Sequence, residues 1–470
     1  IQSSNTIDAE ATFIRRGKLM KYQDLYESKK KTSAELAGLV KSGDTVGFAA
    51  ALSEPPAIIE AIVERVSKGE LGNIKHVGNF MIPRNFGYEN PDVWSRMKTT
   101  GFFLGGSGVR PMVRQGNADY VANHLSQQLR IWEANFRPRV YGALVSPMDE
   151  QGYFSFGVSS LEGQIMKKLA DVIFLEVSPN VPKVHGNNFI HISQVTALCE
   201  SDAKIPVIPL SEPDDDDKKI ASLIAERIED GACLQFGIGR IPDAVGGMLK
   251  DKKHLGIHTE LFCPGMYELV KAGAVDNSAK NIHKGKSVFT FAGGTEETYS
   301  YLNDNPDCEG HPVDYVNNPY VIAKNDKVVS INACIEVDIF GQVCAESIGP
   351  VSISGSGGQL DYVRGAGMSK GGQSFIVMHS TAKNGEVSTI KSILTPGAHV
   401  TTPKNDVDMI VTEYGVAELK YKTASERAKA LIGIAHPDKR EELKFEAKKI
   451  GLMIPAPCAP ARRRRRGAPP

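Results

Sequence analysis

Residues 233–245, Cys-Leu-Gln-Phe-Gly-Ile-Gly-Arg-Ile-Pro-Asp-Ala-Val, hold the pattern that decides the fold. The apolar run Cys233–Phe236 predicts a strand, the glycines predict a tight turn, and Pro242 predicts the first turn of a helix. Such a turn points free backbone N–H groups at an anion or a polarised oxygen, although packing alone can also require it. The turn resembles the dinucleotide motif G-x-G-x-x-G, but Pro242 replaces the third glycine, which argues against a nicotinamide-dependent oxidoreductase.

The same alternation of short apolar runs and amphipathic segments extends in both directions from this unit. Strands are predicted at 45–49, 74–77, 140–145, 172–177, 255–258, 288–291, 328–331, 375–378 and 409–411. Helices are predicted at 55–68, at 219–228, near 267–272 and at 424–434. Strands and helices that alternate in this way indicate an α/β fold with two open, mostly parallel-sheet α/β domains.

Composition shifts along the chain suggest where these domains begin and end. Residues 211–219, Ser-Glu-Pro-Asp-Asp-Asp-Asp-Lys-Lys, place four like charges together, which predicts an exposed connection. We therefore expect a leader at 1–21 that is partly disordered, an N-terminal domain at 22–212, an acidic linker at 213–219 and a C-terminal domain at 220–454. The five arginines within 455–470 predict a disordered tail.

Composition also excludes several classes of partner. Lys+Arg and Asp+Glu are both 55, so the formal net charge is zero and neither a nucleic-acid nor a membrane partner is expected. The seven cysteines form no C-x-x-C pair and the eleven histidines no H-E-x-x-H, so no metal site is predicted. No apolar run reaches the ~20 residues that span a bilayer, and no secretory signal precedes the first domain. We expect a cytoplasmic protein, or one of a mitochondrial or hydrogenosomal matrix if an upstream leader was removed.

Two further stretches carry groups suited to catalysis. Residues 256–260, Gly-Ile-His-Thr-Glu, place Glu260 at the carboxyl end of a predicted strand, where ligands of open α/β sheets bind. A carboxylate there can be a nucleophile, a general base or a residue that starts a helix. Residues 354–359, Ser-Gly-Ser-Gly-Gly-Gln, form a loop that exposes backbone N–H groups and can cradle an oxyanion or a phosphate, or serve as a flexible turn.

The order of these motifs resembles one family. Gln-Phe-Gly-Ile-Gly-x-Ile-Pro-Asp-Ala-Val is followed by Gly-Ile-His-Thr-Glu260, Ile-Asn-Ala-Cys334, Ser-Gly-x-Gly-Gly-Gln-x-Asp-Tyr-Val-Arg-Gly and Val-Thr-Glu-Tyr-Gly-Val-Ala-Glu418. From about Tyr22 to His436 the chain is similar to the acetyl-CoA hydrolase/transferase family, in particular to class I CoA-transferases that act on 4-hydroxybutyryl-CoA or butyryl-CoA with acetate. The fold is then CoA-transferase-like, with its site in the cleft between the domains.

The resemblance implies a role for each matching residue. Glu260 is the expected catalytic nucleophile. The residues expected to bind coenzyme A (CoA) are Gln235, Phe236, Gly237, Ile238, Gly239, Ile335 and Gly358. No metal and no tightly bound cofactor are expected, because CoA is itself a substrate and a transient covalent adduct. The expected partners are an acyl-CoA and a short-chain carboxylate, and the expected assembly is a homo-oligomer, a dimer or a tetramer.

The implied reaction is a ping-pong transfer of CoA through a glutamyl-CoA thioester on Glu260. Three alternatives remain open from the sequence: an acyl-CoA (acetyl-CoA) hydrolase on the same scaffold, a succinyl-CoA:acetate CoA-transferase, and a non-catalytic CoA-binding module. Some relatives carry a histidine after the first strand where this chain has Ala50, so the acyl group is not defined by the resemblance.

Overall fold

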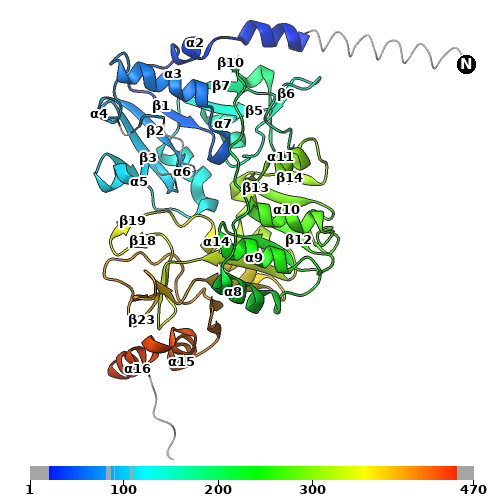
Figure 1. Cartoon of the computed structure of the whole chain (residues 1–470). Coiled ribbons are helices and arrows are strands. Elements are labelled where there is room, and N and C mark those ends of the chain that lie inside the picture. Colours follow the sequence, from blue (N-terminus) through cyan, green and yellow to red (C-terminus); the bar gives the residue numbers. More distant parts are fainter. Residues whose placement is uncertain (1–20, 81–85, 89, 106–108, 453–470) are drawn as a thin grey trace, which may run out of the picture.

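The chain forms two stacked halves, the first blue to cyan and the second green to red in Figure 1, each built around a large sheet. This computed structural model describes residues 21–80, 86–88, 90–105 and 109–452. The predicted leader, apart from Lys21, and the whole predicted tail at 455–470 lie outside the described residues.

The first sheet has seven strands, all parallel, in the order β10-β7-β5-β1-β2-β3-β4. Its strands are β1 Thr45–Phe48, β2 Ile74–Phe80, β3 Met97–Leu104, β4 Ala118–Tyr120, β5 Val140–Val145, β7 Val172–Val177 and β10 Ala197–Glu200. Every residue of β5 is buried, and so is every residue of β7 except Val172. Near-continuous apolar runs of this kind belong to parallel strands covered on both faces, which confirms the predicted sheet type.

The second sheet has nine strands in the order β25-β24-β20-β15-β11-β12-β13-β14-β8, parallel throughout except for β25, which pairs antiparallel with β24. Its strands are β8 His185–Gly186, β11 Cys233–Phe236, β12 Gly256–Phe262, β13 Ser287–Ala292, β14 Cys308–Gly310, β15 Val328–Ala333, β20 Gln373–Val377, β24 Met409–Thr412 and β25 Gly415–Glu418. The strand β12 continues past the predicted end at residue 258, because Leu261 and Phe262 pair with β13. Glu260 therefore lies within the strand, near its carboxyl end.

The direction of the chain reverses at the centre of this second sheet. From β11 the chain adds β12, β13 and β14 on one side, and it then returns to add β15, β20 and β24 on the other side. The neighbouring strands β11 and β15 therefore flank a topological switch point, and open α/β sheets bind their ligands outside the carboxyl ends of such strands.

Helices and short sheets cover the two large sheets. The helices are α2 Ser33–Ala37, α3 Pro56–Ser67, α4 Pro91–Trp94, α5 Val109–Arg114, α6 Gln128–Asn135, α7 Gly163–Leu169, α8 Asp215–Ala225, α9 Arg240–Met248, α10 Pro264–Lys271, α11 Glu296–Leu302, α12 Val313–Val316, α13 Pro319–Ile322, α14 Gln359–Met368, α15 Ala424–Ile434 and α16 Arg440–Lys449. The short strands are β6 Tyr153–Ser155, β9 Phe189–His191, β16 Glu336–Asp338, β17 Val343–Cys344, β18 Ser347–Ile348, β19 Val351–Ser352, β21 Thr381–Ala382, β22 Val387–Ser388 and β23 Ile390–Lys391. Across the described ranges, none of the helices combines the length and the apolar character needed to cross a bilayer.

The acidic stretch does not form the exposed connection that its charge predicts. Asp214 caps α8 by accepting hydrogen bonds from the backbone of Asp216 at 3.1 Å and of Asp217 at 2.9 Å. Successive residues of a helix point in different directions, so the like charges separate and also face the positive end of the helix dipole. Asp217 is 1% exposed and contacts Arg240 Nε at 3.1 Å and His379 Nε2 at 2.8 Å. The segment predicted as a linker is therefore helical from Asp215 on and packs through Asp217, while Asp215 stays exposed.

The two halves share one continuous apolar core. A single cluster of buried side chains contains Val145 and Phe156 from the first half together with Phe262 and Phe291 from the second. The strand β8, which belongs to the first half by sequence, pairs with β14 at the edge of the second sheet. The position of one half therefore fixes the position of the other, which matters for a site that lies between them.

Candidate active site

Glu260 lies on β12 with its carboxylate held by two donors from distant parts of the chain. The Asn317 Nδ2 atom donates to Glu260 Oε2 at 2.7 Å, and the backbone N–H of Gly358 also donates to this carboxylate. The pKa of Glu260 is raised to about 7: burial raises it most, the hydrogen bond from Asn317 lowers it, the charge of Asp361 raises it, and the hydrogen bond from Gly358 lowers it. The group is therefore balanced between its acid and carboxylate forms near neutral pH.

The glycine loop at 354–358 approaches Glu260 more closely than any other residue type allows. A Cβ atom built on Gly358 would overlap both Glu260 Oε2 and Asn317 Nδ2. Gly357 has φ +54°, a conformation that favours glycine. The glycines thus let the backbone at the start of α14 reach the carboxylate, as expected for a loop whose N–H groups are used.

The first half of the chain supports this loop directly. Ser126 donates to the buried Asp361 from its backbone N–H at 3.0 Å and from its hydroxyl at 2.7 Å. The N–H of Leu125 donates to Gly357 O at 3.0 Å, and the Ser356 hydroxyl donates to Asn123 O at 2.6 Å. Glu260 and its donors therefore lie at the junction of the two halves.

The end of α12 is anchored so that Asn317 faces Glu260. His258, from the same motif as Glu260, donates from Nε2 to Val316 O at 2.9 Å, and the Tyr362 hydroxyl donates to the same oxygen at 3.3 Å. Burial lowers the pKa of His258 to about 3, so this histidine stays neutral and acts as a fixed donor. His258 thus positions the helix end and leaves the carboxylate of Glu260 as the reactive group of the motif.

Two of the residues predicted to bind CoA, Gln235 and Phe236, are buried at the end of β11, and a third, Gly237, follows them half-buried. The side chain of Gln235 is 3% exposed and forms reciprocal hydrogen bonds of 3.2 Å with the amide of Asn332. Phe236 is 1% exposed and belongs to the core, and the N–H of Gly237 donates to Ile331 O at 2.9 Å. The structure thus places these residues in the strand end that supports the turn.

Three others line a pocket of about 370 Å³ at the switch point between β11 and β15. They are Ile238, Gly239 and Ile335, and the same pocket is bordered by Arg240 and His379. Gly239 has φ +129° and caps α9, so the backbone turns sharply at the mouth of the pocket. The structure thus arranges these predicted residues in two groups. Ile238, Gly239 and Ile335 line the pocket, whereas Gly358 lies against Glu260 on β12, the strand next to β11.

Sequence reasoning missed Asn317, the residue that holds the carboxylate of Glu260. Asn317 lies 57 residues from Glu260 in a segment without a recognisable motif, so no local signal identifies it. Asp361 falls within the glycine-loop motif, but its contact with Ser126 joins positions 235 residues apart. These contacts depend on how the halves meet, which a single sequence does not reveal.

A carboxylate with a pKa near neutrality, placed beside backbone donors and next to a pocket at a switch point, defines an enzyme site suited to covalent catalysis. The chain belongs to the acetyl-CoA hydrolase/transferase family. The model of the acetyl-CoA hydrolase/transferase N-terminal domain matches residues 14–209, and that of the C-terminal domain matches residues 294–447.

Curated relatives and solved structures agree with this assignment. The chain is 44% identical to succinyl-CoA:cyclohexane-1-carboxylate CoA transferase of Geobacter metallireducens (92% of this chain, 98% of the relative). It is 43% identical to 4-hydroxybutyrate coenzyme A transferase of Clostridium kluyveri (92% of this chain, 100% of the relative). Crystal structures of RipA from Yersinia pestis and of 4-hydroxybutyrate CoA-transferase from Porphyromonas gingivalis match with TM-scores of 0.86 and 0.77 and identities of 37% and 34%. They cover 92% and 91% of this chain and 100% of each matched chain. The predicted family, fold class and enzyme class, CoA-transferase, are confirmed.

Proposed function

We propose that the protein moves CoA from a short-chain acyl-CoA, such as butyryl-CoA or 4-hydroxybutyryl-CoA, to a carboxylate such as acetate, with Glu260 as the covalent nucleophile. The observation that carries this proposal is the Glu260 carboxylate held by Asn317 and Gly358 at the junction of the two halves. Relatives named for CoA transfer to or from carboxylic acids support the reaction type.

The proposed chemistry proceeds in two balanced halves. The ionised carboxylate of Glu260 attacks the thioester carbonyl, which gives a mixed anhydride on Glu260 and releases CoA as a thiolate. The thiolate then attacks the glutamyl carbonyl of the anhydride, which gives a glutamyl-CoA thioester and releases the acyl group as a carboxylate. An incoming carboxylate repeats these steps in reverse and leaves with CoA.

Asn317 and Gly358 are the groups proposed to stabilise the attack of the CoA thiolate on the glutamyl carbonyl. When the thiolate adds to the glutamyl carbonyl, negative charge develops on an oxygen of Glu260. Asn317 Nδ2 and the Gly358 N–H already bond this carboxylate, so they are placed to stabilise the charge without reorganising. Removing one such donor costs about 10²–10³ in kcat in well-studied enzymes. We therefore expect the hydrogen bonds from Asn317 and Gly358 to stabilise the transition state more than the resting carboxylate.

The binding of CoA is proposed at the pocket beside β11 and β15. Ile238 and Ile335 provide apolar walls for the pantetheine arm, and Arg240 at the pocket edge provides a cation for the phosphates.

A cytoplasmic location and a dimeric or tetrameric assembly remain part of the proposal, and sedimentation of the purified protein tests the assembly.

The decisive experiment traps the covalent intermediate. The full chain, mixed with butyryl-CoA and no acceptor, should gain the mass of CoA less one water, and borohydride should then reduce the thioester and inactivate the enzyme. The Glu260→Gln variant should form no adduct, whereas Glu226→Gln on the exposed face of α8 should form it normally. Full transferase activity in Glu260→Gln would refute the proposal.

A second assay separates transfer from hydrolysis. The release of free thiol from acyl-CoA is measured with and without acetate, propionate, butyrate, succinate and 4-hydroxybutyrate. A transferase produces a new acyl-CoA that depends on the added acid, and little free thiol. A hydrolase releases thiol at the same rate whether or not an acid is present.

A further inference from the structure

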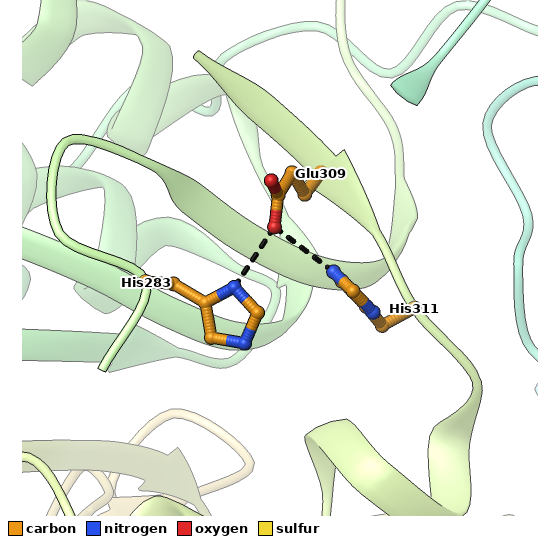
Figure 2. Close-up of side chains that lie close together, drawn as sticks. All are labelled: His283, Glu309 and His311. Carbon is orange, nitrogen blue, oxygen red and sulfur yellow. Dashed lines mark hydrogen bonds and ion pairs between the residues drawn. The ribbon is translucent and has the colours of Figure 1, made fainter. Parts of the chain in front are cut away.

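We propose that His283, Glu309 and His311 form a binding site for one divalent transition-metal ion, best matched by Zn²⁺, separate from Glu260. Figure 2 shows the three side chains converging on one point. The His283 Nδ1 and His311 Nε2 atoms lie 2.8 and 3.0 Å from Glu309 Oε2. All three donor atoms lie within 4.8 Å of one another.

The fold explains why these groups meet. Glu309 lies in β14, and His311 follows two residues later, so the two side chains leave the same face of the extended chain. His283 precedes β13, the strand that pairs with β14, and its ring is 5.0 Å from that of His311. Glu309 is thus held in a strand between β13 and β8, and the two histidines lie in loops beside it.

The distances fit a tetrahedral metal centre after a small adjustment. Zn²⁺ bonds histidine nitrogen and carboxylate oxygen at about 2.0–2.2 Å, which separates ligand atoms by roughly 3.3 Å in a tetrahedron. The separations of 2.8 and 3.0 Å from Glu309 Oε2 to the two ring nitrogens fall a few tenths of an ångström below this value, as expected where a proton, not a cation, lies between the atoms. Two histidines and one carboxylate are also a ligand set found at zinc sites that keep a fourth position open.

A divalent metal binds the neutral ring of a histidine and the ionised form of a carboxylate. It would therefore displace the proton that a ring nitrogen shares with Glu309 in each of the two hydrogen bonds.

A supporting contact and an access route complete the site. The other ring nitrogen of His283, Nε2, lies 2.8 Å from the Tyr315 hydroxyl, the kind of outer contact that orients metal-binding histidines. His283, His311 and Tyr315 line a pocket of about 520 Å³, through which an ion and a water ligand can enter. Lys168 and Asp314 border the same pocket, so its wall carries one basic and one acidic side chain.

The proposed metal site also lies close to Asn317, the residue that holds the carboxylate of Glu260. Tyr315 belongs to α12, and Asn317, two residues later, is the cap of that helix and the donor to Glu260. A metal bound through His283 would hold Tyr315 and thus stabilise α12. This role is structural, and it does not depend on the proposed transfer reaction.

The test uses the untagged full chain, stripped with a chelator and titrated with ZnCl₂ alone. We expect one equivalent of Zn²⁺ per chain by calorimetry and a melting temperature that rises with the Zn²⁺ concentration. The variants His311→Ala and Glu309→Gln should bind at least tenfold more weakly. His254→Ala, which removes an exposed histidine paired with Asp276, should bind as the parent does.

Two further measurements separate this site from the alternatives. Among the described residues, Asp214, Asp217 and His379 form the other group with metal-ligand spacing, so His379→Ala should leave binding intact. Absorption spectroscopy at the zinc edge should show nitrogen and oxygen ligands without sulfur. Unchanged binding in His311→Ala, loss of binding in His379→Ala, or a sulfur ligand would overturn the proposal. If His311→Ala fails to fold, Tyr315→Phe keeps all three ligands and should weaken binding about tenfold.

Discussion

Asn317 donates a 2.7 Å hydrogen bond to Glu260 across 57 residues of sequence, and its amide also bonds the buried Asp361. One side chain therefore contacts two carboxyl groups whose pKa values are raised to about 7 and about 6. Because Asp361 in turn accepts hydrogen bonds from Ser126 in the first half, Glu260 is connected to both halves of the fold. The predictions below follow from this network.

Asn317→Ala should lower kcat by about a hundredfold, because one of the two donors to the developing charge is lost. The same hydrogen bond lowers the pKa of Glu260, so the pKa should rise in the variant and the acid limb of the kcat/KM profile should move to higher pH. The neighbouring Asn318→Ala removes the cap of α13 and is the matched control. An unchanged kcat in Asn317→Ala would contradict the assignment.

Gly358→Ala should reduce activity by a hundredfold or more, because the new Cβ overlaps Glu260 Oε2 and displaces the carboxylate, and a shift of about 1 Å can cost this much. Gly367→Ala lies in the same helix with open space around the added atom, and it should keep full activity. That control should also gain about 0.5–1 kcal/mol in the free energy of unfolding, since alanine loses less backbone entropy. Steady-state assays and urea unfolding measure both effects.

The kcat/KM should rise with pH through about 7, because only the ionised form of Glu260 attacks the thioester. Stability should show the opposite trend. The pKa of Glu260 in the folded protein lies above the ordinary value of 4.5, so its contribution to stability is greatest below pH 4.5 and declines as the pH rises through about 7. Glu260→Gln, which mimics the protonated form, should therefore raise the melting temperature more at pH 8 than at pH 5. An equal change at both pH values would refute the raised pKa.

Asp361→Asn should move the acid limb of kcat/KM to lower pH, because the charge of Asp361 raises the pKa of Glu260. Ser126→Ala removes the hydroxyl donor to Asp361 but keeps the charge of Asp361, so it should not move the acid limb of kcat/KM to lower pH. Comparing the two pH profiles separates the electrostatic role of Asp361 from its role in joining the halves. A limb that stays in place in Asp361→Asn would show that its charge does not act on Glu260.

Ile335→Glu should raise the KM for acyl-CoA at least tenfold and change the KM for acetate little, because it places a charge in the proposed apolar wall for the pantetheine arm. Ile393→Glu, at a side chain that is 63% exposed, is the matched control and should leave both values unchanged. Equal increases in both KM values would place CoA elsewhere.

The sheets could be predicted because their strands are continuous apolar runs with clear ends. The runs at 140–145 and 172–177 appear with the predicted bounds, since burial on both faces leaves no polar alternation to interpret. The helix that begins in the acidic run at 214–217 is not predicted, because net charge along the sequence does not show which side of a helix each carboxylate faces. The strand β11 shows the same limit of sequence analysis. The side-chain amide of Gln235 hydrogen-bonds Asn332 in the neighbouring strand β15, and no local pattern predicts this contact. Sequence patterns thus single out Glu260 and the glycine loops as candidates, whereas the contacts between distant segments require the three-dimensional fold.

The strand β8 has a consequence for any attempt to divide the chain. His185–Gly186 hydrogen-bonds to β14, so a fragment that starts at residue 213 would leave the outer row of N–H and C=O groups of Cys308–Gly310 without its native neighbour. An unpaired sheet edge is a template for association with other chains. The second half expressed alone should therefore aggregate, and supplying the first half in trans should restore solubility by returning the missing strand.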